Sequence, residues 1–161
     1  MNNIQDLPVL NAGEQEAIGK AVVLLINTCP FINGIDVIYE DIAVGAMGVF
    51  PTSGTVYLKR FVTGMFIGRY AFQILYRIRP GADETKVREE KRLDALADWL
   101  EGRTVTFNGI EYQMVAAPEL TDDRTLRMIE KSTNASIAGV LQDGSIDYQV
   151  YLQLEYQKKG M

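Results

Sequence analysis

The clearest pattern along the chain is an alternation of apolar and polar residues over positions 66–78 and again over 148–157. Even positions of both runs carry aromatic or aliphatic residues apart from Gly68, whereas odd positions include Arg69, Gln73 and Gln149. Alternation of this length predicts two long strands, each with one buried face, and their shared pattern indicates neighbours in one antiparallel sheet. The residues expected on the helix-covered face are Phe72, Ile74, Tyr76, Val150, Leu152 and Leu154.

Two stretches have the spacing of helices. Residues 13–28 repeat apolar residues at helical intervals and end before Pro30, and a second helix begins at Asp83 and ends at Gly102. The strands fall in blocks around these helices, which predicts a single α+β domain over residues 1–161. It has a mainly antiparallel β-sheet with two principal helices packed on one face.

Shorter strands complete the expected sheet. Residues 55–62 pair with the first long strand through Thr63-Gly64, and Asn108-Gly109 predicts a tight hairpin between 104–107 and 110–114. The remaining strands are expected at 35–40, 126–130 and 135–141. Residues 42–54, rich in glycine, proline and serine, are interpreted as a partly extended loop or flexible arm that becomes ordered on assembly.

Composition agrees with one globular domain, because 161 residues with 47% apolar residues can build a core without a metal or a disulfide. The 16 basic and 21 acidic residues give a net charge of −5, which argues against a general affinity for nucleic acid or an anionic membrane. The acidic N-terminal residues and the short apolar runs predict neither an export signal nor a membrane span. Cys29, the single cysteine, is expected to be a small buried hydrophobe.

The chain contains no histidine. This excludes Ser-His and Cys-His nucleophilic pairs, histidine general bases and histidine-ligated metals. We therefore expect no catalytic residue, no metal and no cofactor, and predict that the protein is not an enzyme.

Two motifs have a functional and a plain structural interpretation. Gly45 and Gly48 could suggest a phosphate loop, but no lysine motif or helix follows them, which favours an ordinary loop. The carboxylates that follow from Asp143 are spaced like those at the start of a calcium loop. Leu154 occupies the twelfth position, where such a loop needs a glutamate, which favours a hairpin turn.

Basic and aromatic residues are mixed on the central strands, among them Lys59, Arg60, Arg69, Arg77 and Arg79 beside Tyr57, Phe61 and Tyr70. Such a mixture could bind nucleic acid. The net charge favours a solvent-facing sheet surface whose charges meet the acidic second helix or a neighbouring subunit.

Segments across nearly the whole chain resemble a family of phage proteins. They are Met47-Gly48-Val49, Ser53-Gly54, Lys59 to Gly64, Tyr70 to Arg77, Ala97 to Leu100 and Tyr148 to Tyr156. The chain is similar to the tail terminator (tail completion) proteins, some labelled minor capsid proteins, of long-tailed phages and prophages of Gram-positive bacteria. These are strand and turn patterns, and no dedicated functional residue can be matched.

The resemblance implies a structural protein of the virion tail, present in the host cytoplasm during assembly. It would cap the tail tube as a homo-oligomeric ring, expected to be a hexamer, and form the head-tail joining surface. The implied partners are copies of itself, the tail tube protein and a neck or head-completion protein, with DNA passing through without specific binding.

Residues for the subunit or tube contact are chosen from the aromatic-rich ribbon and the segment before it, which offer an adaptable surface. These interface candidates are Met47, Phe50, Tyr57, Lys59, Arg60 and Phe61. Two alternatives stay open: another head-tail connector or neck component, and a small-molecule-binding or enzymatic α+β domain, which a deep polar pocket would favour.

Overall fold

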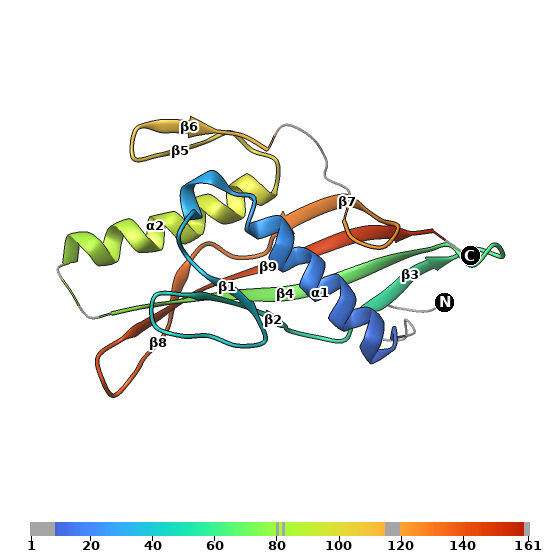
Figure 1. Cartoon of the computed structure of the whole chain (residues 1–161), viewed down its shortest axis with the longest axis horizontal. Coiled ribbons are helices and arrows are strands. Elements are labelled where there is room, and N and C mark those ends of the chain that lie inside the picture. Colours follow the sequence, from blue (N-terminus) through green and yellow to red (C-terminus); the bar gives the residue numbers. More distant parts are fainter. Residues whose placement is uncertain (1–8, 80, 82, 115–119, 160–161) are drawn as a thin grey trace.

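The computed structural model describes residues 9–79, 81, 83–114 and 120–159. The chain forms two α-helices, one 3-10 helix, a seven-stranded sheet and a separate two-stranded sheet within these residues (Figure 1). The helical elements are α1 (Ala12–Ile26), η2 (Pro30–Ile32) and α2 (Asp83–Leu100). The strands are β1 (Val37–Tyr39), β2 (Met47–Pro51), β3 (Val56–Arg60), β4 (Phe66–Ile78), β5 (Val105–Phe107), β6 (Ile110–Tyr112), β7 (Arg124–Lys131), β8 (Ser136–Val140) and β9 (Ile146–Lys158).

The centre of the large sheet is the antiparallel pair β4–β9, each strand 13 residues long. Pairing runs without interruption from Phe66 opposite Lys158 to Ile78 opposite Ile146. Burial alternates along both strands, and the buried set is the even-numbered one that the sequence predicts. Its members Phe72, Ile74, Tyr76, Val150, Leu152 and Leu154 are all buried in the core.

The other strands extend this pair on both sides. β2 and β3 lie one after the other beside β4, and β7 and β8 lie one after the other beside β9. All of these pairings are antiparallel, whereas β1 joins the far side of β2 in parallel. The expected α+β class with a mainly antiparallel sheet is therefore confirmed.

Both helices pack on the face that carries the buried side chains. Asn11 caps α1 by accepting a hydrogen bond from the Glu14 backbone at 2.8 Å, and the helix buries Ile18, Val22 and Ile26 against β1, β2 and β4. α2 packs on β9, β7 and β4, and it ends with Gly102 at a φ of 89°. Figure 1 shows α1 crossing in front of the strands, with α2 beside it.

The prediction of a loop over residues 42–54 is wrong over Met47–Pro51, because this segment is β2, paired to β1 on one side and to β4 on the other. Met47 and Val49 lie in the core with 0% exposure. Gly48 points to the opposite face, where a Cβ would meet the Asp41 carbonyl and would lie 2.6 Å from Cε2 of Phe50. Glycine is needed at this position of the strand because the Asp41 backbone and the Phe50 ring come close to its Cα, so Gly48 does not mark a loop.

Candidate functional site

The β3–β4 hairpin carries most of the residues that the sequence suggested for a partner contact. Its turn is closed by hydrogen bonds from the Phe61 nitrogen to the Met65 carbonyl at 2.9 Å and from the Gly64 nitrogen to the Phe61 carbonyl at 3.0 Å. Val62 at the tip is fully exposed. Figure 1 shows the tip extending past both helices at one end of the sheet. We call residues 57–65 the hairpin tip.

The basic side chains of the hairpin tip lie over aromatic rings. The Arg60 guanidinium is 4.0 Å from the centroid of the Tyr57 ring, which in turn meets Phe66 edge-on at 5.0 Å. The Lys59 ammonium is 5.0 Å from the centroid of Phe61. Each such contact at an exposed site contributes about 0.5–1 kcal/mol, so the rings orient these two charges while leaving them open to solvent.

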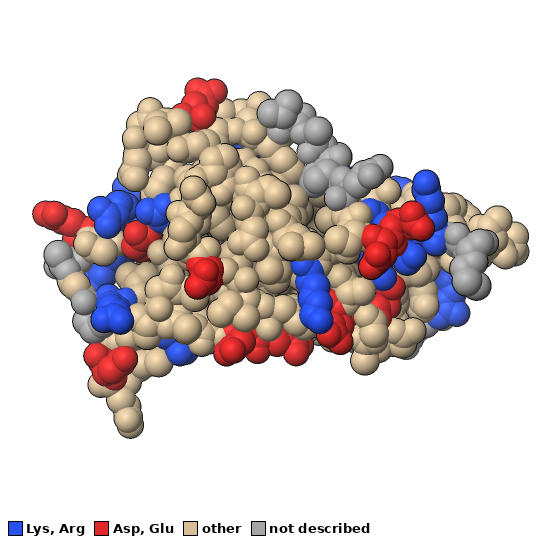
Figure 2. Space-filling model, viewed as in Figure 1, with Lys and Arg blue, Asp and Glu red and all other residues tan. Residues whose placement is uncertain are grey.

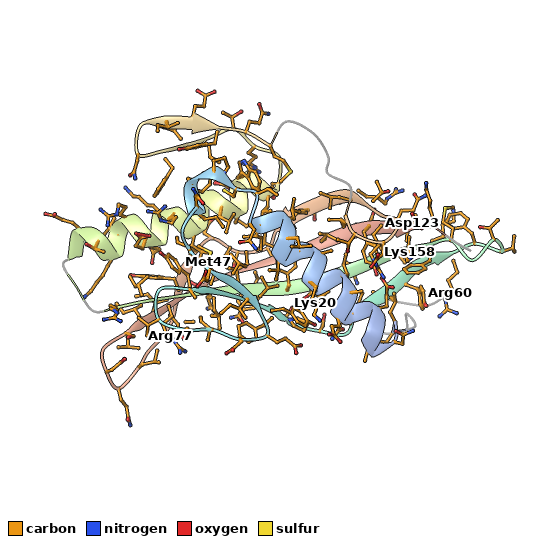
Figure 3. The ribbon with its side chains drawn as sticks, in the orientation of Figure 1. Lys20, Met47, Arg60, Arg77, Asp123 and Lys158 are labelled. Carbon is orange, nitrogen blue, oxygen red and sulfur yellow. The ribbon has the colours of Figure 1, made fainter. Side chains whose placement is uncertain are left out.

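A bulge between Tyr57 and Lys59 distributes these residues over two faces. Tyr57 and Arg60 pair with even-numbered positions of β4, on the side of the helices, whereas Lys59 pairs with Ile67, on the other side. Figure 3 shows Arg60 near one end of the molecule and Arg77 towards the other. The hairpin tip thus presents one cation and one aromatic ring on each side.

The two remaining candidates, Met47 and Phe50, do not join the hairpin tip. Met47 is fully buried on β2, so its side chain is not available to a partner in this fold. Phe50 lies further along β2, opposite Gln73 of β4, and is partly exposed on the face that α1 and α2 leave open. The sequence suggested all six because they share a stretch of chain, but β2 pairs with residues 72–76 of β4 and β3 with residues 66–69, so the two groups lie at different levels of the sheet.

The face of β4 and β9 opposite the helices is polar, and we call it the open face. Nε2 of Gln73 donates to Oε1 of Gln149 at 2.8 Å and to the Tyr151 hydroxyl at 3.2 Å. Arg77 forms a bidentate pair with Asp147 at 2.8 and 3.0 Å, which raises the pKa of Arg77. The expectation that these basic residues meet the second helix is wrong for Arg77, because α2 packs on the other face.

Cross-strand pairs continue along the open face towards β7. Nε of Arg127 lies 2.9 Å from a Glu155 oxygen, and Nε2 of Gln153 donates to Glu130 at 3.2 Å. These groups satisfy one another across the strands. The open face therefore combines opposite charges and amides, with no excess of one sign among the pairs.

Figure 2 shows the opposite side of the molecule, with charged residues at both ends and along one margin and an uncharged area between them. The chain has no charged residue from Ala21 to Ile35, the stretch that forms the second half of α1 and η2. Leu24, in the second half of α1, is 56% exposed. This area was not among the sequence candidates, although the charge-free run could have indicated it.

A hollow of about 950 Å³ lies between α2 and the β5–β6 hairpin. Val87 and Phe107 form apolar parts of its wall, and Arg88, Lys91 and Asp94 bring charges to it. Most of these side chains stay in solvent, and only Val105 and Phe107 of the wall are buried. The hollow is an open groove along a helix.

The described residues offer few groups for chemistry. No cluster of three or more histidine, cysteine, aspartate or glutamate side chains among them could hold a metal ion. Burial raises the pKa of the Cys29 thiol to about 12, so at neutral pH it is a protonated core side chain, as the sequence predicts. Asp143 accepts from the Ser145 nitrogen at 2.9 Å, which is the turn role favoured over a calcium loop.

Across the part of the chain that is described, the helices lack the length and apolar character needed to cross a membrane. No protein-family model matches the sequence, and no curated protein matches it either.

Proposed function

We propose that the protein is a structural component of a long-tailed phage, a tail terminator that caps the tail tube as a ring of identical subunits and forms the surface to which the head joins. One observation carries the proposal. The hairpin tip exposes Val62 completely, and Lys59, Arg60 and Phe61 precede it directly in the chain, at the end of two long paired strands.

This arrangement suits contact with another protein better than turnover of a substrate. An exposed apolar side chain on one hairpin with aromatic rings and an arginine has the composition of a protein interface. The long β4–β9 pair fixes the base of the hairpin, so little ordering remains when the tip binds. The tip is basic in a chain of net charge −5, so it attracts acidic surfaces, including those of other copies.

The open face fits the passage of DNA in such a ring. Two of the arginines on this side, Arg77 and Arg127, already pair with carboxylates of β9, which makes them less available to phosphate, and Arg69 lies opposite Glu155 on the same face. Affinity for DNA depends on free cations. A wall of this kind lets the duplex slide, whereas a basic wall would hold it.

Two experiments test the proposal. Deleting the gene from the phage or prophage that carries it should give tails of uncontrolled length without heads, and unchanged virions would exclude a terminator. The Lys59→Glu/Arg60→Glu variant should still fold, because the two ring contacts that it removes contribute only about 0.5–1 kcal/mol each, and it should fail to restore tail length.

A matched control is a double variant that changes the net charge by the same amount at residues outside the hairpin tip. Lys20 and Arg103 have side chains 61% and 70% exposed, away from the hairpin tip, and the Lys20→Glu/Arg103→Glu variant should restore normal tails. Equal behaviour of the two double variants would remove the hairpin tip from the contact.

The groove between α2 and the β5–β6 hairpin favours a second candidate function, the binding of a small molecule. Native mass spectrometry of the purified protein would reveal a bound molecule, and Thr106→Trp, which fills the groove, should abolish its retention. Purified protein without such a molecule would count against this candidate.

A further inference from the structure

β8 is an edge strand whose second side has no partner among the residues that the structure describes. It pairs with β9 from Ser136 opposite Gln149 to Val140 opposite Ile146. Every residue of the strand is exposed except Gly139, which is partly so. Figure 1 shows β8 at the opposite end of the sheet from the hairpin tip. Its outer backbone groups are therefore available for another strand.

The sequence of β8 lacks the features that usually protect such an edge. From Ser132 to Gln142 the chain contains no charged residue and no proline. Ile137 is 54% exposed and Val140 is 67% exposed. Sheets of stable monomers place lysine, proline or a covering loop at an edge, because an open apolar edge pairs with other chains. Only the bulge between Ile137 and Gly139 interrupts this edge.

The opposite edge of the same sheet is β1, and its direction matches. β8 runs parallel to β4, because each is antiparallel to β9, whereas β1 runs antiparallel to β4, because it is parallel to β2. A second copy placed beside the first with its sheet continuing in the same sense would therefore bring β8 and β1 together antiparallel, the more stable pairing. Val37, Ile38 and Tyr39 of β1 are uncharged as well.

The two edges also lie at the same level of the sheet. β1 pairs with Met47 to Val49 of β2, and these three residues lie opposite Ile74 to Tyr76 of β4. β8 pairs with the part of β9 that lies opposite Leu75 to Ile78. A copy can therefore join its neighbour by a lateral step, without sliding along the strands.

We propose that β8 of one copy pairs antiparallel with the free side of β1 of the next copy, so that neighbouring sheets become continuous. The contact is between different surfaces, and such contacts close into rings when the rotation between copies allows it. In a closed ring each β8 and each β1 has a partner, which removes both open edges. The inference deepens the proposed function, because it names the contact that builds the ring.

Disulfide trapping tests the pairing directly. In a Cys29→Ala background, Ile38→Cys is combined in turn with a cysteine at Ser136, Ile137, Gly139 and Val140. Opposed residues of an antiparallel pair have Cα atoms about 4.5–5.5 Å apart, within the range that a disulfide spans. At least one combination should give a covalent ladder that stops at the ring size, while each single-cysteine variant should give none.

Other results overturn the pairing. Dimers from Ile137→Cys alone would indicate that two β8 strands pair with each other. Rings seen by electron microscopy without a ladder from any combination would place the contact elsewhere, and so would a chain that stays monomeric at every concentration.

A charge at the edge gives a second measurement that needs no cysteine. Ile137→Lys should raise the protein concentration needed for assembly by at least about tenfold, because lysine at an edge opposes strand addition. Ile110→Lys is the matched control, since Ile110 is 56% exposed on β6, outside the large sheet. Equal effects of the two lysines would overturn the pairing.

The proposed function and the pairing can fail separately. A ladder in a protein whose deletion leaves tails unchanged would keep the pairing and exclude the terminator. Uncontrolled tail length on deletion of the gene, with no covalent ladder from the cysteine variants, would keep the terminator and exclude the pairing.

Discussion

The carboxylate of Glu14 ties α1 to the sheet through a buried ion pair. Its two oxygens accept hydrogen bonds from Nε and Nη2 of Arg124 at 2.7 and 2.6 Å, and one of them also accepts from the Tyr156 hydroxyl at 2.7 Å. Arg124 is only 5% exposed. The hydrogen bond with Glu14 raises the pKa of Arg124, so the guanidinium stays charged within the fold.

Glu14→Gln removes the countercharge and keeps the size of the side chain. Loss of one partner of a buried ion pair destabilises a protein by about 3–5 kcal/mol, because the other charge stays buried and uncompensated. Asp122 lies 3.7 Å from Arg124 but is 82% exposed, and an exposed charge offsets at most about 1 kcal/mol. The glutamine oxygen still accepts one hydrogen bond. We therefore expect the free energy of unfolding to fall by about 3 kcal/mol.

Urea unfolding followed by circular dichroism measures this change, with Glu16→Gln as the control on the same helix. Glu16 pairs with Lys20 at 2.6 Å, but the two side chains are 55% and 61% exposed. Such a helix pair contributes about 0.3–0.5 kcal/mol, so the control should remain close to the wild type. A loss below about 1 kcal/mol for Glu14→Gln, or equal losses for both variants, would refute the account of a buried charge pair.

Three further results are expected. Tyr70→Phe should keep or raise the free energy of unfolding, because the buried Tyr70 hydroxyl has no hydrogen-bond partner among the described residues; a clear loss in urea unfolding would show that it has one. Burial, with Glu40 next, raises the pKa of Tyr39 from 10.0 to about 12, so its stabilising contribution is complete below pH 10 and disappears as the pH rises towards 12. Unfolding of the wild type and of Tyr39→Phe between pH 8 and 12 checks this, and equally steep losses of stability in both would contradict it. Gly48→Ala should destabilise the fold by about 1–3 kcal/mol, because its Cβ would overlap the backbone oxygen of Asp41 and the Phe50 ring. Gly139→Ala, which meets no atom within 4 Å, should have little effect in thermal unfolding, and equal effects would contradict the close approach.

The helices and strands that could be predicted are those whose pattern lies within one short stretch of the sequence. The alternation in β4 and β9 predicts both the strands and the buried face, because a one-residue slip would turn every side chain to the wrong side. The β5–β6 hairpin follows from Asn108-Gly109, whose φ angles of 51° and 80° belong to the tight turn that this pair of residues favours. Gly102 ends α2 for a similar reason.

Features that depend on distant residues could not be predicted in this way. β2 resembles a loop in sequence because Gly48 and Pro51 are turn residues elsewhere, and only its two neighbouring strands make it part of the sheet. The same omission placed Met47 among the interface candidates. Glu14 and Arg124 are 110 positions apart, so no local spacing indicates their pairing. The open side of β8 is likewise a property of the sheet order.

The hairpin tip and the open side of β8 lie at opposite ends of one rigid strand pair. The tip begins beside Phe66, and β8 pairs near the level of Tyr76, which is about ten residues along β4, or about 33 Å at 3.3 Å per residue. Two contacts at this separation do not compete for space, so a copy held at β8 can bind a different protein through its tip. Because β4 and β9 pair along their whole length, the angle of the tip relative to the neighbouring copy is fixed by the sheet. A contact between copies at β8 would therefore set all the hairpin tips at one level, which is what a flat surface on the end of a tube requires.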